Sequence, residues 1–261
     1  MCFLVSWAGV TGHRARVSGR GRAGHAGRCG VIPIRDINPT VRFPFITVLL
    51  IGVNIAVFLY QVTLGGSAGE SFVTSYAFIP ERLFSLTTAG GKAPVAATLF
   101  TSLFLHGGLF HIAGNMLFLW IFGNNVEDAM TRVRFIVFYL FCGIAATFSH
   151  ALVNVSSPVP VIGASGAISG VLGAYLLLYP RARVLTLVVF GFFVRTVPVP
   201  AVVVLGFWFV LQFANALLSP RGGGGVAWFA HVGGFIAGLA LIGLFKRRDV
   251  RFWGGRSYGN V

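Results

Sequence analysis

Residues 226–245 read VAWFAHVGGFIAGLALIGLF, twenty consecutive residues without a charged side chain. A helix of about 20 apolar residues is long enough to cross the hydrocarbon core of a bilayer. Five further apolar stretches precede this one, at residues 44–64, 107–123, 135–154, 162–179 and 199–218. The sequence therefore predicts an all-α, polytopic membrane protein built as a bundle of six transmembrane helices.

The overall composition agrees with this interpretation. Hydrophobic residues make up 56% of the 261 residues, and charged residues make up only 10%. A soluble domain usually carries about 25% charged residues, so the composition argues against an ordinary water-soluble globule, and it excludes a disordered chain. The three cysteines, Cys2, Cys29 and Cys142, form no CxxC pair and indicate neither a disulfide framework nor a zinc site.

The distribution of basic residues predicts the orientation in the membrane. The chain has 20 Lys and Arg against 6 Asp and Glu. With a cytoplasmic N-terminus, seven, two, three and five basic residues fall in the four inside segments, and two, none and one fall in the three outside loops. Cytoplasmic segments accumulate Lys and Arg, so both termini are expected in the cytoplasm. The net charge of +14 is then an orientation signal, and no nucleic-acid partner is expected.

The regions outside the spans divide the chain further. Residues 1–31 lack the features of a signal peptide, and we expect a disordered tail or a start-site artefact there. Residues 32–246 form the expected membrane domain, and residues 247–261 form a basic cytoplasmic tail. The apolar segment 184–194 is too short to span and is expected to be interfacial or folded back. The long outside loop, about residues 65–106, is expected to fold against the helices.

Polar residues inside membrane spans are costly, so each one is a candidate functional residue. The informative ones are His111, Asn115, Ser165, Ser169 and His231. With the predicted orientation, the spans that carry them all start outside, and the polar groups lie at a similar depth just below the outer surface. Taken singly, each has a plainer interpretation. A serine in a membrane helix often donates a hydrogen bond to a backbone carbonyl of its own helix, and a His or Asn side chain often forms a hydrogen bond between two helices.

Glycine pairs suggest that two of these spans approach each other closely. Gly166 and Gly170 lie four residues apart in the fourth span, and Gly234 and Gly238 do so in the sixth. Small residues at this spacing allow helix backbones to pack closely. This packing would bring Ser165 within hydrogen-bond reach of His231.

A serine paired with a histidine is the usual basis of nucleophilic catalysis, because the imidazole removes the hydroxyl proton. The oxyanion that develops needs hydrogen-bond donors, which the Ser165 backbone N–H at a helix start and the Asn115 side chain could supply. None of the predicted spans contains an acidic residue, so a Ser-His dyad is expected rather than a triad. The six acidic residues are Asp36, Glu70, Glu81, Glu127, Asp128 and Asp249.

Three motifs together resemble a known family. HGGLFHIAGN at 106–115, GASG at 163–166 and AHVGGFIAG at 230–238 resemble the signature regions of the rhomboid intramembrane serine proteases. The resemblance extends in order and topology from about Ile32 to Lys246. GxSG alone is a weak signal, but the three motifs on alternate spans with matching orientation are together specific.

This resemblance implies roles for individual residues. Ser165 would be the nucleophile and His231 the general base. Asn115 and His111 would line the oxyanion hole together with the Ser165 backbone N–H. The resemblance also suggests supporting roles for Gly163 in the turn before the nucleophile, His106 near the cavity, and the helix-packing glycines Gly166, Gly234 and Gly238. The tyrosine that some members carry one turn after the nucleophile is replaced by Ser169.

The family also implies partners and a location. The expected substrates are single-span or polytopic membrane proteins, cut in or near a transmembrane segment, with the lipid bilayer as surroundings. No metal and no other cofactor is expected, since HExxH and Cys/His clusters are absent from the sequence. A bare six-span core suggests a multi-pass protein of a bacterial plasma membrane.

Two alternatives remain at this point. The first is a catalytically inactive rhomboid-like protein that binds client transmembrane helices, although Ser165 and His231 are both present. The second is a small transporter, which is disfavoured because the polar groups cluster at one depth and no inverted repeat is apparent.

Overall fold

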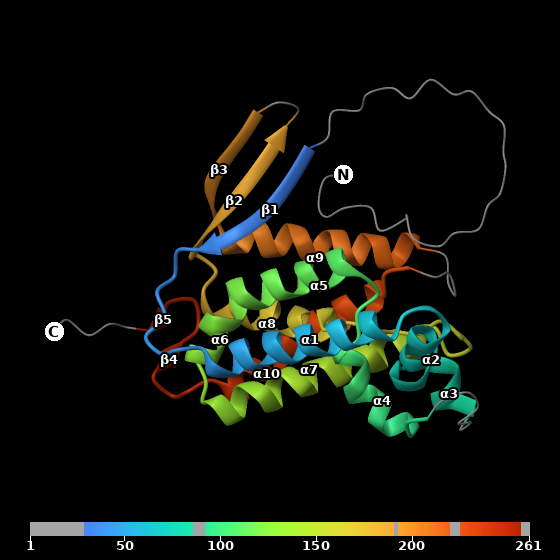
Figure 1. Cartoon of the computed structure of the whole chain (residues 1–261). Coiled ribbons are helices and arrows are strands. Elements are labelled where there is room, and N and C mark those ends of the chain that lie inside the picture. The colour runs from blue at the N-terminus through green and yellow to red at the C-terminus, as the bar shows by residue number, and fades with distance from the viewer. Residues whose placement is uncertain (1–28, 86–91, 191–192, 220–224, 257–261) are drawn as a thin grey trace.

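The structure is a computed structural model that describes residues 29–85, 92–190, 193–219 and 225–256. Long helices lie side by side in a bundle, and a small sheet projects from one edge of it, near the start of α9 (Ala201–Leu218) (Figure 1). The long helices are α1 (Phe45–Leu64), α7 (Arg132–Val153), α8 (Ser165–Leu178), α9 (Ala201–Leu218) and α10 (Trp228–Phe245). Between α1 and α7 the chain forms several shorter helices.

The expected span at 107–123 is part of a longer helical segment. It comprises α5 (Leu109–Phe118), a π-helical turn η2 (Leu119–Gly123) and α6 (Asn124–Asp128). A helical stretch at Val95–Phe104 precedes it and is bent from it by 83°. The segment therefore runs five residues beyond the expected end, so that Glu127 and Asp128 belong to its last turn rather than to a loop.

The helix lengths agree with a membrane protein. Helices α1, α7, α9 and α10 are long and apolar enough to cross a bilayer, and the bent segment is a fifth candidate. Helix α8 has only 14 residues, a rise of about 21 Å, and nearly all of its side chains are buried in the bundle. The expected multi-pass helical membrane protein is confirmed. The count of six spans and the cytoplasmic position of both termini stay predictions.

The expectation of an all-α fold is wrong at one edge of the bundle. Strands β1 (Cys29–Asp36), β2 (Arg183–Phe190) and β3 (Phe193–Pro200) form an antiparallel sheet in the order β1-β2-β3. The segment 184–194 is folded back as the β2–β3 hairpin, with residues 191–192 outside the described residues. Its β-branched residues favour strands, but its partner β1 comes from a distant part of the chain, and a local pattern gives no sign of that pairing.

The two expected terminal regions are only partly described. β1 begins at Cys29 and so includes the last residues of the expected leader, while residues 1–28 lie outside the described residues. In the basic tail, β4 (Val250–Arg251) pairs with β5 (Gly255–Arg256). Residues 257–261 of the tail lie outside the described residues.

The long loop after α1 forms short helices at one end of the bundle (Figure 1). These are α2 (Gly66–Tyr76), α3 (Pro80–Ser85), α4 (Val95–Thr101) and the 3-10 turn η1 (Ser102–Phe104), and residues 86–91 lie outside the described part. A β-bridge joins Phe78 of this loop to Val161, shortly before α8. The folded loop is thereby tied to the segment that leads to Ser165.

The other end of the bundle is held by a buried carboxylate. Glu127 accepts hydrogen bonds from the backbone N–H groups of Ile46 and Thr47 at 2.9 and 2.7 Å, and from the Thr47 hydroxyl at 2.8 Å. These N–H groups belong to the first turn of α1 and have no partner within the helix. Glu127 therefore fixes the start of α1 against the end of α6.

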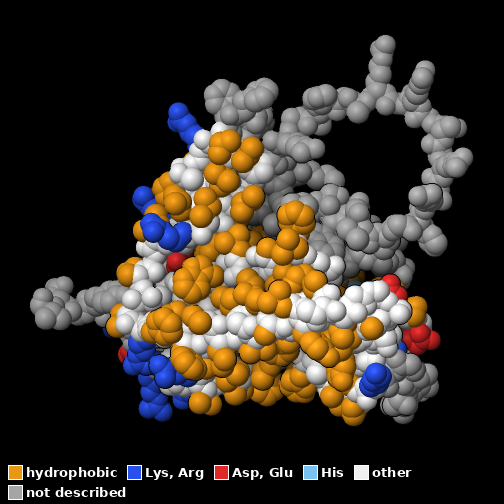
Figure 2. Space-filling model, in the orientation of Figure 1, with side chains coloured by type: hydrophobic (Ala, Val, Ile, Leu, Met, Phe, Trp, Pro, Cys, Tyr) orange, Lys and Arg blue, Asp and Glu red, His pale blue; other side chains and the backbone are white. Residues whose placement is uncertain are grey.

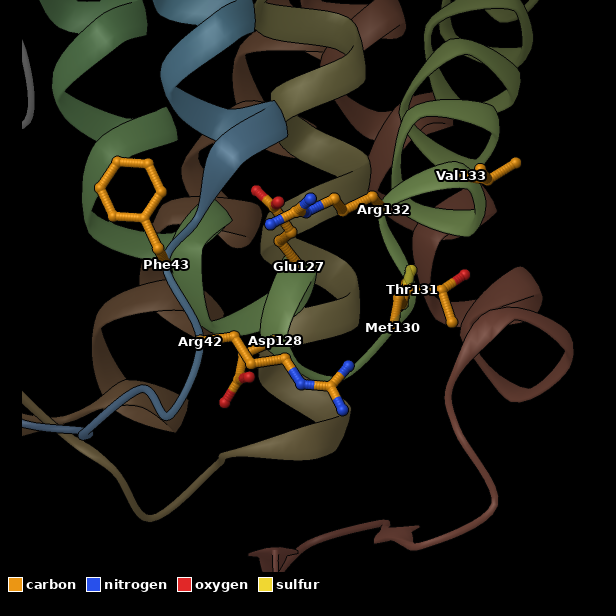
Figure 3. A pocket seen from close by; sticks show the side chains of 8 residues that line it. All are labelled: Arg42, Phe43, Glu127, Asp128, Met130, Thr131, Arg132 and Val133. Atoms are coloured by element: carbon orange, nitrogen blue, oxygen red, sulfur yellow. The ribbon is translucent and has the colours of Figure 1, made fainter.

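A cavity of about 590 Å³ lies beside this carboxylate (Figure 3). Its lining residues are Arg42, Phe43, Glu127, Asp128, Met130, Thr131, Arg132 and Val133. It lies at the start of α7, whereas Ser165 follows the end of that helix, so this cavity is distinct from the candidate site. Figure 2 shows hydrophobic side chains spread over the bundle, with most of the Lys and Arg side chains in view toward this same end.

Candidate active site

A tight turn presents Ser165 at the start of α8. Gly163 has a φ of +115°, in a region that glycine adopts without the steric cost of a side chain. The Gly163 backbone N–H donates to the carbonyl of Ser102 at 2.9 Å. Because this bond and the Phe78–Val161 bridge hold the turn, the position of Ser165 as the first residue of α8 is fixed from two sides.

His231 lies in the first turn of α10 and faces Ser165. The distance between His231 Nε2 and Ser165 Oγ is 2.8 Å. The two residues come from helices whose facing sides are lined by glycine. The structure thus brings together the serine and the histidine that the sequence analysis singled out, within hydrogen-bond distance.

The glycine pairs explain why these helices approach so closely. A Cβ atom added at Gly234 would overlap the carbonyl oxygen of Gly166, and one added at Gly238 would overlap the carbonyl oxygen of Gly170. Helix α8 is also close to α7, since a Cβ at Gly166 would lie 2.7 Å from Ala146 Cβ. The GxxxG pairs therefore remove the side chains that would otherwise separate α8 from α10.

The second ring nitrogen of His231 is hydrogen-bonded to Gln212, a residue that the sequence motifs do not include. His231 Nδ1 lies 2.7 Å from Oε1 of Gln212, which comes from α9 and is 7% exposed. A carbonyl oxygen only accepts hydrogen bonds, so the proton of the neutral ring lies on Nδ1, and Nε2 is left to accept from the Ser165 hydroxyl. In the described part of the chain, the bonded partners of the imidazole are thus a serine and an amide.

Aromatic rings surround the imidazole where Ser169 replaces the tyrosine of some family members. The Trp208 ring centroid lies 6.1 Å from that of His231 at 36°, and the Trp228 centroid lies 6.0 Å away at 87°. The Ser169 hydroxyl instead donates to the Ser165 carbonyl at 2.7 Å. The packing that holds the histidine ring therefore comes from α9 and α10 rather than from α8.

His106 and Asn115 form a hydrogen-bonded chain near the start of α5. His106 Nδ1 lies 3.3 Å from the Phe104 carbonyl, and His106 Nε2 lies 3.0 Å from Asn115 Nδ2. The carbonyl can only accept, so the ring donates from Nδ1 and accepts from the amide at Nε2. Gln61 of α1 exchanges two hydrogen bonds of 3.1 Å with the His106 backbone, which fixes this residue in the core.

His111 and Asn115 lie against the turn that precedes Ser165. A Cβ added at Gly163 would lie 2.7 Å from His111 Nε2 and 3.6 Å from Asn115 Nδ2. His111 Nδ1 accepts from the Gly107 N–H at 3.3 Å, so its neutral ring carries the proton on Nε2, the atom that faces the turn. Two side-chain nitrogens that can donate are therefore brought close to the Gly163 turn that precedes Ser165.

One signal in the sequence could have revealed Gln212. It lies in the predicted span 199–218, among apolar residues, and the rule that polar residues in spans are candidates applies to it as much as to His231.

Among the residues that the structure describes, no group of three or more His, Cys, Asp or Glu side chains is arranged to hold a metal ion.

The comparisons with known proteins decide the family. A family model described as the rhomboid domain matches residues 94–248. The chain belongs to the rhomboid family. The matched range includes Asn115, Ser165, Gln212 and His231, while β1 and α1 lie before it.

Several rhomboid proteins are similar over a larger or smaller part of the chain. "Rhomboid protease GluP" of Bacillus subtilis is 33% identical over 206 residues, which are 78% of this chain and 36% of that protein. "RHOMBOID-like protein 1" of Arabidopsis thaliana is 32% identical, over 58% of this chain and 34% of that protein. "Rhomboid protein 1, mitochondrial" of Saccharomyces cerevisiae is 31% identical, over 57% of this chain and 41% of that protein. The matches thus cover well under half the length of these relatives.

Proposed function

We propose that this rhomboid-family chain is an intramembrane serine endopeptidase that hydrolyses peptide bonds in or near transmembrane segments of other membrane proteins. The observation that carries the proposal is the 2.8 Å distance between Ser165 Oγ and His231 Nε2. A serine hydroxyl becomes an effective nucleophile when an adjacent base takes its proton. The name of the Bacillus relative, a rhomboid protease, supports the same reaction class.

The first half of the reaction forms an acyl-enzyme. His231 Nε2 takes the hydroxyl proton as Ser165 Oγ bonds to the carbonyl carbon of the substrate, and the carbonyl oxygen becomes an oxyanion. The Ser165 backbone N–H, Asn115 and His111 stabilise this oxyanion, because preorganised donors are worth most in a site that excludes bulk water. The C–N bond then breaks, and the proton on His231 Nε2 passes to the leaving amine.

The second half releases the product and restores the enzyme. His231 takes a proton from a water molecule as the water oxygen bonds to the acyl carbon. The tetrahedral intermediate collapses, the bond to Ser165 Oγ breaks, and the hydroxyl recovers its proton from His231. No cofactor takes part in this scheme.

The substrate class follows from where the site lies. Ser165 begins α8 and His231 lies in the first turn of α10, so with the proposed orientation the site lies just below the outer surface. A transmembrane helix bonds all of its backbone groups internally and resists attack until it unwinds. The substrates are therefore single-span or polytopic membrane proteins with helix-breaking or small residues near the outer end of a span.

The chain is a multi-pass integral membrane protein, and we place it in a bacterial plasma membrane. The match to the Bacillus protein covers the largest share of this chain among the relatives described. The relative from yeast mitochondria is similar over a shorter part.

The proposal is tested by cleavage of a model transmembrane substrate by the purified protein in liposomes. Ser165→Ala and His231→Ala should each reduce cleavage to near background, because the nucleophile or its base is lost. Ser169→Ala is the matched control, since Ser169 is in the same helix and, within the described part of the chain, its hydroxyl bonds to the Ser165 carbonyl alone. We expect this variant to keep activity within a few-fold of the wild type.

Equal cleavage by the wild type and Ser165→Ala would refute the assignment of the nucleophile. Binding of the substrate by the wild type without cleavage would favour the client-binding alternative.

A further inference from the structure

A buried glutamine in the middle of an apolar helix needs an explanation. Gln212 lies in α9, where Leu211 and Phe213 flank it, and its side chain is 7% exposed. A polar group within a membrane span is costly unless it is hydrogen-bonded. The 2.7 Å contact between Gln212 Oε1 and His231 Nδ1 supplies such a bond.

This bond determines which nitrogen of His231 acts as the base. If the proton were on Nε2, then Nδ1 and the amide oxygen would both be acceptors at 2.7 Å, and Nε2 could not take the hydroxyl proton of Ser165. The acceptor at Nδ1 disfavours that tautomer. The same oxygen also stabilises the imidazolium that forms during the reaction, since hydrogen bonds to a charged donor are roughly twice as strong as neutral ones.

We propose that Gln212 is a positioning residue of the catalytic site, which holds His231 in the tautomer and orientation that activate Ser165. The inference rests on the proposed function. Gln212 occupies the place that a buried carboxylate holds in a Ser-His-Asp triad. A neutral amide avoids the high cost of an isolated carboxylate in a membrane interior, which gives a physical reason for an amide here.

The orientation of His231 also depends on the position of helix α9, which carries Gln212. Helix α9 lies at the edge of the bundle (Figure 1) and presents Phe207, Val210 and Phe213 outward, 51%, 60% and 47% exposed. Trp208, one turn before Gln212, lies beside the His231 ring. Two side chains of one peripheral helix therefore hold the imidazole, so the base is correctly oriented only while α9 is seated against α10.

Four variants test this role in the purified protein in liposomes. Gln212→Met keeps the side-chain length but removes the carbonyl acceptor. Gln212→Asn keeps the amide but is shorter by one methylene, and Gln212→Glu keeps an acceptor in place. The control is Asn215→Ala in the same helix, because among the described residues the Asn215 amide donates to the Leu211 carbonyl of its own helix and not to the site.

We expect Gln212→Met and Gln212→Asn to lower kcat about 10- to 100-fold, the size of effect seen when a metal-ligating histidine loses the partner that orients its ring. KM should change less than about two-fold, because Gln212 holds the base and does not contact the substrate. Gln212→Glu should have a kcat within a few-fold of that of the wild type. The kcat of Asn215→Ala should equal that of the wild type. A purely structural role would instead lower the thermal midpoint and leave the kcat of the folded protein unchanged.

A second readout needs no substrate. Nitrogen-15 NMR of histidine-labelled protein, with the His231 signal assigned from His231→Asn, should show the proton on Nδ1 in the wild type and a tautomer mixture in Gln212→Met. Unchanged kcat together with an unchanged tautomer in Gln212→Met would overturn the role of Gln212. An inactive wild type whose tautomer still depends on Gln212 would instead contradict the proposed function alone.

Discussion

At the scale of single residues, the candidate site is defined by what each polar atom faces. His231 has one ring nitrogen toward Ser165 Oγ and the other toward Gln212 Oε1. Gly163 gives the turn a conformation that other residues rarely adopt. The chemistry therefore depends on a few contacts whose geometry leaves little freedom.

The Gly163 turn gives a residue-scale prediction. In Gly163→Ala, the left-handed backbone costs about 1–3 kcal/mol, and the new Cβ would lie 2.7 Å from His111 Nε2. We expect substrate cleavage to fall at least about 10-fold, because His111 and the Ser165 backbone are both displaced. Thermal unfolding and cleavage of the same preparation measure the two effects.

The control for this change is Gly206→Ala in α9, where an added Cβ meets no atom within 4 Å. It should unfold and cleave like the wild type. If Gly163→Ala cleaves as well as Gly206→Ala, the turn is not essential to the site.

At the scale of elements, the packing of α8 against α10 brings the serine to the histidine. The sequence predicted this contact from Gly166, Gly170, Gly234 and Gly238, because small residues four apart are a local pattern with a direct packing consequence. The bond from Gln212 could not be predicted in the same way. It depends on how α9 is rotated and how deeply it is seated, and neither is encoded in a short motif.

The helix contact gives an element-scale prediction. Gly238→Ala places a Cβ onto the Gly170 carbonyl and forces α10 away from α8. Overpacking of this kind costs about 1–3 kcal/mol, and the Ser165–His231 distance should increase. We expect a lower thermal midpoint and at least a 10-fold loss of cleavage.

Gly243→Ala is the comparison, since it lies in the same helix and its nearest neighbour would be Phe252 Cζ at 3.7 Å, an ordinary contact. Cleavage by this variant should equal that of the wild type. Equal losses in Gly238→Ala and Gly243→Ala would mean that the effect is not specific to the α8–α10 contact.

At the scale of the whole molecule, the sequence predicted the helical membrane bundle because long apolar runs are strong local signals. It did not predict the β1-β2-β3 sheet, in which β1 pairs with a hairpin from a distant part of the chain. One contact that ties this sheet to the bundle is Asp36 of β1, whose carboxylate accepts from Asn125 and from the Tyr175 hydroxyl, the latter at 3.0 Å.

The Asp36 contact predicts a pH dependence of stability. Burial raises the pKa of Asp36 from its ordinary value of 3.8 to about 6, although the bonds from Tyr175 and Asn125 act in the opposite direction. A raised pKa in the folded state means that protonation favours folding. The stabilising contribution of Asp36 is therefore complete below about pH 4 and is lost as the pH rises through about 6.

Thermal unfolding of the wild type and Asp36→Asn between pH 4 and 7.5 measures this contribution. The midpoint of the wild type, relative to that of the variant, should be higher at pH 4 than at pH 7.5. Glu70→Gln, a change at an exposed carboxylate in α2, serves as the control and should follow the wild type. A constant difference between wild type and Asp36→Asn at every pH would contradict the prediction.

The most direct test of the central claim is covalent labelling of the nucleophile. A fluorophosphonate reacts with a serine whose hydroxyl is activated by a base. The experiment can therefore be done without knowing the substrate. We predict that mass spectrometry of the labelled protein in liposomes finds the adduct on Ser165, and that His231→Ala abolishes it. Labelling of another residue, or equal labelling of Ser165 with and without His231, would contradict the account.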